Sequence, residues 1–137
     1  MIQIIKGIFI FLVVMLTSCG TKRTPNSCVG VICTADFRMM TIKLIDSTGA
    51  DFIPEKVETY GEDSILIQSQ IGQAIPGQNM YTIIDDSHIS NLGVNIENNV
   101  LFKVFKNGQV LKQQLYKVKA DCCHIIPISK DSMLIVN

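Results

Sequence analysis

The strongest constraint on the fold is a pair of strand-like segments that flank the dipeptide Asn107-Gly108. Residues 99–106 (NVLFKVFK) and 109–119 (QVLKQQLYKVK) are separated by these two residues alone. Asn-Gly suits a type I′ turn, in which both central residues take positive φ and the twist of the turn matches that of paired strands. The sequence therefore predicts an antiparallel β-hairpin over residues 99–119.

Shorter strand-like segments, separated by turn signals, occupy most of the remaining chain after residue 38. Their ranges are 39–46, 56–60, 64–69, 80–84, 122–129 and 132–136. Residues 70–79 hold two glycines and a proline, and we expect a long loop there. No segment of ten or more residues has the apolar spacing of an amphipathic helix. The pattern predicts an all-β fold, a single small antiparallel β-sandwich.

The N-terminal residues 1–18 have the layout of an export signal. Lys6 is their only charged side chain, and the apolar run that follows it is shorter than the roughly 20 residues of a membrane-spanning helix. Leu16 and Ser18, which precede Cys19, resemble a bacterial lipobox, the cleavage and acylation signal of lipoproteins. This resemblance implies a signal peptide over residues 1–18 and an acylated Cys19.

The chain after Cys19 is expected to divide into a tether and one folded domain. Residues 19–27 are polar, contain Pro25 and show no periodicity, which is typical of a flexible linker. The β-sandwich domain is then predicted over residues 28–137, a length that suits a single domain.

Charge and motif content exclude several classes of function. Lysine and arginine number 12, as do aspartate and glutamate, and loss of Lys6 with the signal leaves the chain close to neutral. A nucleic-acid-binding protein would need a clustered basic face, so no nucleic-acid partner is expected. The chain lacks a Gly-x-Ser-x-Gly elbow, a phosphate loop and a dinucleotide fingerprint. His88 and His124 are its two histidines, and we expect a solvated side chain at the first and a packed or hydrogen-bonded one at the second. We therefore predict no catalytic residues and no cofactor.

Four cysteines remain once Cys19 is assigned to the lipid. An even number in an exported chain indicates two disulfides. A bridge between the adjacent Cys122 and Cys123 would close a strained ring, and neighbouring strand residues point to opposite faces. We therefore expect two long-range bridges that join Cys28 and Cys33 to Cys122 and Cys123, with the pairing left open. The chain-entropy model assigns about 4–5 kcal/mol to one loop of roughly 90 residues, and the second bridge should add less.

A metal site is the alternative use of these side chains. Cysteine and histidine are the ligands that zinc and copper prefer, and Cys122 and His124 would share one face of a strand over residues 122–129. Cys123 would then lie on the opposite face, which makes convergence of all the ligands awkward. This alternative predicts a metal-handling protein with Cys122 and His124 among its ligands.

Four segments together resemble a known group of proteins. They are residues 33–38 (CTADFR), 46–49 (DSTG), 81–87 (YTIIDDS) and 120–125 (ADCCHI). They are similar to segments of small lipoproteins of Bacteroidetes-type bacteria, whose domain is similar to the carboxypeptidase-regulatory or transthyretin-like β-sandwich. The resemblance implies a fold and an envelope location, and it supplies no catalytic residues.

The expected function is that of a non-enzymatic structural or binding module of the bacterial envelope. Its partners would be the lipid bilayer, reached through acylated Cys19, and an envelope protein. Gly20 stands where some bacteria place the aspartate that retains lipoproteins in the inner membrane, so an outer-membrane location facing the periplasm is expected. A role as an enzyme or an enzyme accessory would rest on fold analogy alone.

Overall fold

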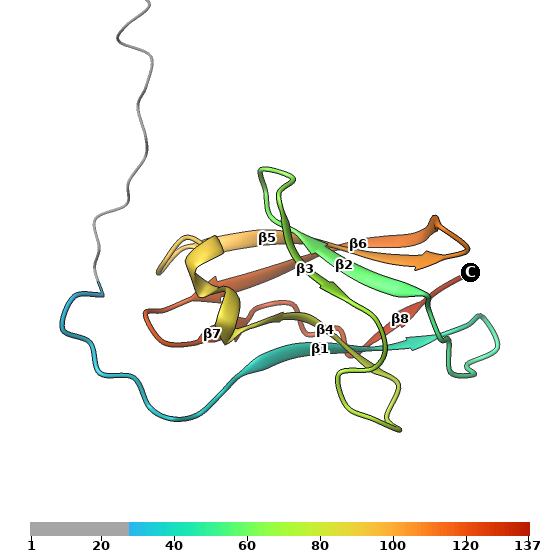
Figure 1. The fold of residues 1–137 in the computed structure, drawn as a ribbon, viewed down its shortest axis with the longest axis horizontal. Coiled ribbons are helices and arrows are strands. Elements are labelled where there is room, and N and C mark those ends of the chain that lie inside the picture. The colour runs from blue at the N-terminus through green and yellow to red at the C-terminus, as the bar shows by residue number, and fades with distance from the viewer. Residues whose placement is uncertain (1–27) are drawn as a thin grey trace, which may run out of the picture.

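The computed structural model describes residues 28–137, which form two β-sheets packed face to face (Figure 1). The sheets have the strand orders β4-β1-β8 and β3-β2-β5-β6-β7. The elements are β1 (Met39–Ile45), β2 (Lys56–Tyr60), β3 (Leu66–Gln70), β4 (Met80–Asp85), the 3₁₀ helix η1 (Asp86–Asn91), β5 (Glu97–Lys106), β6 (Gln109–Ala120), β7 (Ile125–Pro127) and β8 (Met133–Ile135). The predicted all-β sandwich is confirmed for this part of the chain. The predicted signal peptide, Cys19 and the tether lie in residues 1–27, outside the described residues.

The predicted hairpin is confirmed and forms the centre of the five-stranded sheet. β5 and β6 pair antiparallel from Glu97↔Lys119 to Lys106↔Gln109. Both turn residues take positive φ, 52° at Asn107 and 71° at Gly108, as the type I′ turn requires. The turn chemistry therefore fixes which faces of these two strands are buried.

The core lies between the two sheets and is built from the inward faces of their strands. The largest fully buried side chains include Phe102 and Tyr116, whose rings meet edge to face with centroids 6.2 Å apart. One hydrogen bond also links the sheets directly, because the buried Thr59 hydroxyl on β2 donates to the Ile83 carbonyl on β4 at 2.5 Å. The strand-like segments of the sequence thus produce a continuous apolar core.

The sandwich is not purely antiparallel, so that part of the prediction is wrong. β8 pairs parallel to β1, with Lys43↔Met133 and Ile45↔Ile135. The reason is that the chain crosses from β7 in one sheet to β8 in the other without reversing its direction. Both strands then run the same way as β1, and the C-terminus lies at the opposite end of the sandwich from the start of β1 (Figure 1).

Two ends of the sandwich can be distinguished. We call one the stapled end; it consists of residues 28–34, the loop at residues 92–96 and the bend at residues 121–124. The far end carries the hairpin turn at residues 107–108 and the loop at residues 71–79 (Figure 1). This loop is the one expected between residues 70 and 79. The stapled end holds a network of polar side chains from distant segments, formed by Thr34, His124 and Asp86.

Candidate functional site at the stapled end

Two cysteine pairs at disulfide distance join the start of the domain to the bend after β6. Cys28 pairs with Cys122 across 94 residues, and Cys33 pairs with Cys123 across 90 residues. The Cα atoms are 5.3 Å apart in both pairs, within the range of unstrained disulfides. Both bridges are thus long-range, as expected, and the structure supplies the pairing that the sequence left open.

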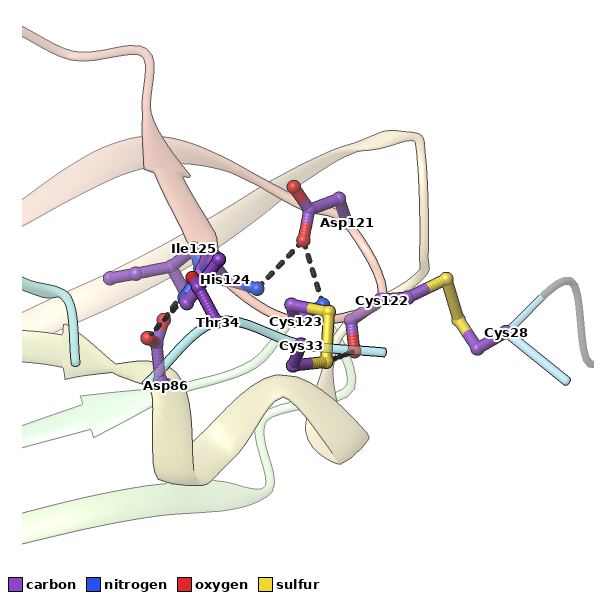
Figure 2. The surroundings of a disulfide bond; sticks show 9 residues. All are labelled: Cys28, Cys33, Thr34, Asp86, Asp121, Cys122, Cys123, His124 and Ile125. Atoms are coloured by element: carbon purple, nitrogen blue, oxygen red, sulfur yellow. Dashed lines mark hydrogen bonds and ion pairs between the residues drawn. A yellow bond between two sulfur atoms is a disulfide. The ribbon is translucent and has the colours of Figure 1, made fainter. Parts of the chain in front are cut away.

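The cysteine pair lies in a bend and not in a strand, which corrects the prediction of a strand from residue 122. Asp121 Oδ1 accepts hydrogen bonds from the backbone N–H groups of Cys123 and His124, both at 2.7 Å. This aspartate turn breaks the strand alternation, and regular pairing resumes only at Ile125. The same two backbone hydrogen bonds lower the pKa of Asp121. Figure 2 shows the two bridges leaving the bend toward different points of the N-terminal segment.

His124 links two segments that are distant in sequence. Its ring is buried, and Nδ1 lies 2.8 Å from Asp86 Oδ2 while Nε2 lies 2.9 Å from the Thr34 hydroxyl (Figure 2). A carboxylate can only accept, so in the neutral ring Nδ1 carries the proton and Nε2 accepts from Thr34. The expectation of a hydrogen-bonded His124 is confirmed.

Asp86 is the carboxylate at the centre of this network. Besides the His124 ring, it accepts from the backbone N–H of Arg38 at 2.8 Å and from that of Ile125 at 2.7 Å. Burial by itself would raise the pKa of Asp86, but the hydrogen bonds from His124, Ile125 and Arg38 outweigh it and lower the pKa. One ionised side chain thus holds together the entry to β1, the start of η1 and the start of β7.

An open hollow of about 390 Å³ adjoins the network. Its lining combines apolar and polar groups: Val31, Ile32, Thr34, Arg38, Asn95, Asp121, Cys122, Cys123 and His124. Thr34 and His124 are therefore accessible from this hollow, whereas Asp86 lies behind them.

The metal alternative named Cys122 and His124 as ligands. The sulfur of Cys122 is bonded to Cys28, and both ring nitrogens of His124 have protein partners. Within residues 28–137, no group of three or more histidine, cysteine, aspartate or glutamate side chains is placed to hold a metal ion. The structure offers no observation that favours metal binding by these two residues.

His88, expected to be solvated, is instead half-buried in η1. Its Nδ1 lies 2.9 Å from Asp85 Oδ1, and Asp85 also caps η1 by accepting from the Ser87 backbone N–H at 3.0 Å. This cap lies one residue before Asp86, so it fixes the direction of the chain where Asp86 turns toward the stapled end.

The sequence did not reveal the network that joins Asp86 and Thr34 to His124. A signal for Asp86 was present in the polar run Asp85-Asp86-Ser87 that ends β4, since such residues cap and turn the chain. Nothing in the sequence showed that this run would meet residue 124, because that contact depends on the packing of the two sheets.

A second polar cluster lies on the outer face of the five-stranded sheet. Glu58 is largely buried between Lys56 and Tyr60, with its oxygens 2.7 Å from Lys56 Nζ and 2.5 Å from the Tyr60 hydroxyl. Burial would raise the pKa of Glu58, but the hydrogen bonds from Lys56 and Tyr60 lower it. Lys103 Nζ lies 4.3 Å from the centroid of the Tyr60 ring, and Leu115 on the neighbouring β6 is exposed. This face combines charged, aromatic and aliphatic groups.

Comparisons with known proteins find no match to the chain. This holds for protein-family models, for curated proteins and for solved structures. Among the described residues, no helix is long and apolar enough to span a membrane.

Proposed function

We propose that the protein is a lipid-anchored, non-enzymatic module of the bacterial cell envelope, processed at Cys19 and carrying a β-sandwich of the carboxypeptidase-regulatory or transthyretin-like type. The observation that carries this proposal is the pair of bridges from Cys28 and Cys33 to residues 122 and 123. Disulfides persist in oxidising compartments such as the periplasm, so their presence agrees with export by the signal over residues 1–18. The lipobox-like residues 16–19 then supply the anchor.

The position of the bridges suits a tethered domain. Cys28 and Cys33 both precede β1, so a pull along the tether would meet a covalent junction before it reaches the first strand. Several acyl chains make membrane anchoring stable, whereas one chain alone is marginal. We place the domain at the outer membrane, facing the periplasm, where the outer face of the five-stranded sheet presents Tyr60, Lys103 and Leu115 to an envelope partner.

Acylation of Cys19 is tested by expressing the full chain in a Gram-negative bacterium fed with labelled palmitate. The label should enter the native protein, and the protein should float with the membranes. The variant C19S is the control, because it keeps the export signal but removes the thiol that receives the lipid. An unlabelled native protein that fractionates like C19S would refute the anchored module.

The order of Thr34, His124 and Asp86 favours a second candidate function, acyl transfer at the stapled end. Hydrogen bonds link a hydroxyl to an imidazole and the imidazole to a carboxylate, the same order of groups as in hydrolases with a catalytic triad. In such a reaction Thr34 Oγ1 bonds to the carbonyl carbon of an ester while its proton passes to His124 Nε2. The leaving alcohol then takes that proton, and water hydrolyses the acyl-threonine. We rank this second because Asp86 and His124 also join three segments, which is sufficient reason for their contacts.

A fluorophosphonate probe separates the two candidates, because it modifies a hydroxyl only when a neighbouring base activates it. Labelling of the native chain and loss of labelling in T34V would establish acyl transfer. An unlabelled native chain would leave the anchored, non-enzymatic module as the function.

A further inference from the structure

Apolar side chains are exposed at the stapled end, at the point where the tether joins the domain. Val29 is 84% exposed, Ile32 is 95% exposed and Val31 is 49% exposed. We call these three residues the apolar loop. Cys28 and Cys33 flank it and are both bridged to the bend at residues 121–124. The loop is thus presented from a fixed backbone and loses less conformational entropy on binding than a free segment would.

The length of the tether decides what the apolar loop can meet. Cys19 precedes Cys28 by nine residues. A chain of this length spans about 30 Å when fully extended, and about 17 Å on average as a flexible coil. We infer that the apolar loop inserts into the interfacial region of the bilayer that holds the lipid anchor. This inference rests on the proposed acylation of Cys19.

The far end of the domain cannot reach the bilayer while the stapled end points away from the membrane. β6 has 12 residues, so the two ends are about 40 Å apart, farther than the extended tether reaches. Ile71 at the far end is 85% exposed, but it lies on the loop at residues 71–79. The apolar loop is therefore the exposed apolar segment that the anchor holds nearest to the membrane.

The charges near the apolar loop fit an anionic bilayer. Lys22 and Arg23 lie in the tether between the anchor and the loop, and basic residues at that distance are attracted to anionic headgroups. Arg38 also lines the hollow at this end. Among the carboxylates there, Asp121 accepts two backbone hydrogen bonds within the bend, Asp86 is hydrogen-bonded to the His124 ring and to two backbone N–H groups, and Asp36 is exposed. A docked loop would direct the far end, with the hairpin turn, away from the membrane.

The absence of tryptophan from the chain allows a direct test. The full-length protein carrying I32W would be purified from membranes and reconstituted in vesicles of phosphatidylglycerol and phosphatidylcholine that contain brominated acyl chains. I71W is the matched control, because it replaces an equally exposed isoleucine at the far end of the same anchored protein. We expect bromine quenching of the I32W fluorescence to be at least twofold stronger than that of I71W. Replacement of Val29 and Val31 by serine in the I32W protein should reduce the difference.

Equal quenching of the two tryptophans would overturn the docking, as would quenching of I32W that is unchanged by the two serines. Equal quenching is also expected if a second copy of the chain or another protein covers the apolar loop, since the brominated lipid would then not reach I32W. Failure of the proposed anchor is recognised separately: a protein without lipid would not stay with the vesicles during flotation. Migration of all variants as oxidised monomers without reductant checks that each has folded.

Discussion

Asp86 joins three described segments that are distant in sequence. Its carboxylate accepts from Arg38 before β1, from the His124 ring and from Ile125 at the start of β7. Hydrogen bonds to a charged partner contribute more than neutral ones, about 1.5–3 kcal/mol each. The stapled end therefore depends on this one partly buried charge as well as on the disulfides.

Replacement of Asp86 by asparagine should destabilise the domain by about 2–3 kcal/mol at pH 7, because the neutral amide accepts more weakly and points a donor at N–H groups. The lowered pKa of Asp86 also sets a pH dependence. Above the ordinary value of 3.8 the carboxylate is ionised in both folded and unfolded chains, so its stabilisation is complete. As the pH falls below 3.8 the unfolded chain binds the proton first, and this stabilisation is lost.

The difference between the native protein and D86N in free energy of unfolding should therefore shrink below pH 3.8. Urea denaturation at pH 7 and pH 3 measures it. D36N serves as the control, because Asp36 is exposed and its replacement should change neither value. A D86N penalty that is as large at pH 3 as at pH 7 would show that the charge is not what holds the segments.

Removal of the Tyr116 hydroxyl should stabilise the domain, whereas replacement of Asp86 should destabilise it. The Tyr116 hydroxyl is fully buried and has no hydrogen-bond partner among the described residues, and burial raises its pKa to about 12. An unsatisfied buried polar group costs about 1–3 kcal/mol, so Y116F should stabilise the domain by about 1 kcal/mol. Y116F should also lose less stability than the native protein above pH 10, because the unfolded chain no longer has this phenol to ionise.

Thermal unfolding at pH 7 and pH 11 tests this, with Y81F as the matched variant. The Tyr81 hydroxyl is equally buried but donates to Asn79 Oδ1 at 3.2 Å. Y81F should therefore be less stable than the native protein at pH 7. If both variants shifted the melting temperature in the same direction, the unpaired hydroxyl of Tyr116 would not explain the result.

At the scale of elements, the sequence predicts best where local chemistry decides the structure. The Asn107-Gly108 turn needs only its own two residues and the strands beside it, and its hairpin is correctly predicted. The strand expected from residue 122 fails because Asp121 bonds to the two N–H groups that strand pairing would use. Alternation alone does not reveal that competition.

The parallel pairing of β8 could not be predicted from its residues. Met133, Leu134 and Ile135 suit either strand direction, and the outcome depends on the connection from β7, which changes sheets. The contact between Asp86 and His124 is of the same kind, since it joins residues 38 positions apart across the two sheets. Such contacts follow from the packed sandwich and not from local sequence.

The two disulfides should contribute non-additively, because they join nearly the same two segments. With one bridge in place, the other closes only a short ring of about eight residues, worth about 2–3 kcal/mol in the chain-entropy model, against about 4–5 kcal/mol for the long loop. C28S/C122S and C33S/C123S should each cost about 2–3 kcal/mol. Removal of both bridges should cost about 7 kcal/mol, more than the sum of the two.

Urea denaturation of the three variants at pH 7 measures these differences. The two single-bridge variants control for each other, because each retains one long-range closure. A double removal that equals the sum of the single ones would mean that the bridges act on independent parts of the domain.

At the scale of the whole molecule, the proposed lipid anchor would join the sandwich to a membrane through its disulfide-bridged end. The strand-like segments and the turns allowed the fold class to be predicted. The four cysteines allowed two long-range bridges to be predicted but not their partners. The balanced charge predicts no nucleic-acid partner. The proposed envelope partner could not be identified from any local sequence pattern, since a sheet face is recognised by its shape and its combined side chains.

Mass spectrometry of the native protein tests most directly whether a lipid anchor on Cys19 is followed by a disulfide-stapled domain. The protein would be extracted from membranes of an expressing Gram-negative bacterium with free thiols blocked, and its intact mass and non-reduced peptide map would be determined. We expect a chain that starts at Cys19 with acyl groups attached, lighter by two hydrogens for each disulfide, with Cys28 linked to Cys122 and Cys33 to Cys123. An unmodified Cys19, or four blocked thiols in the domain, would contradict it.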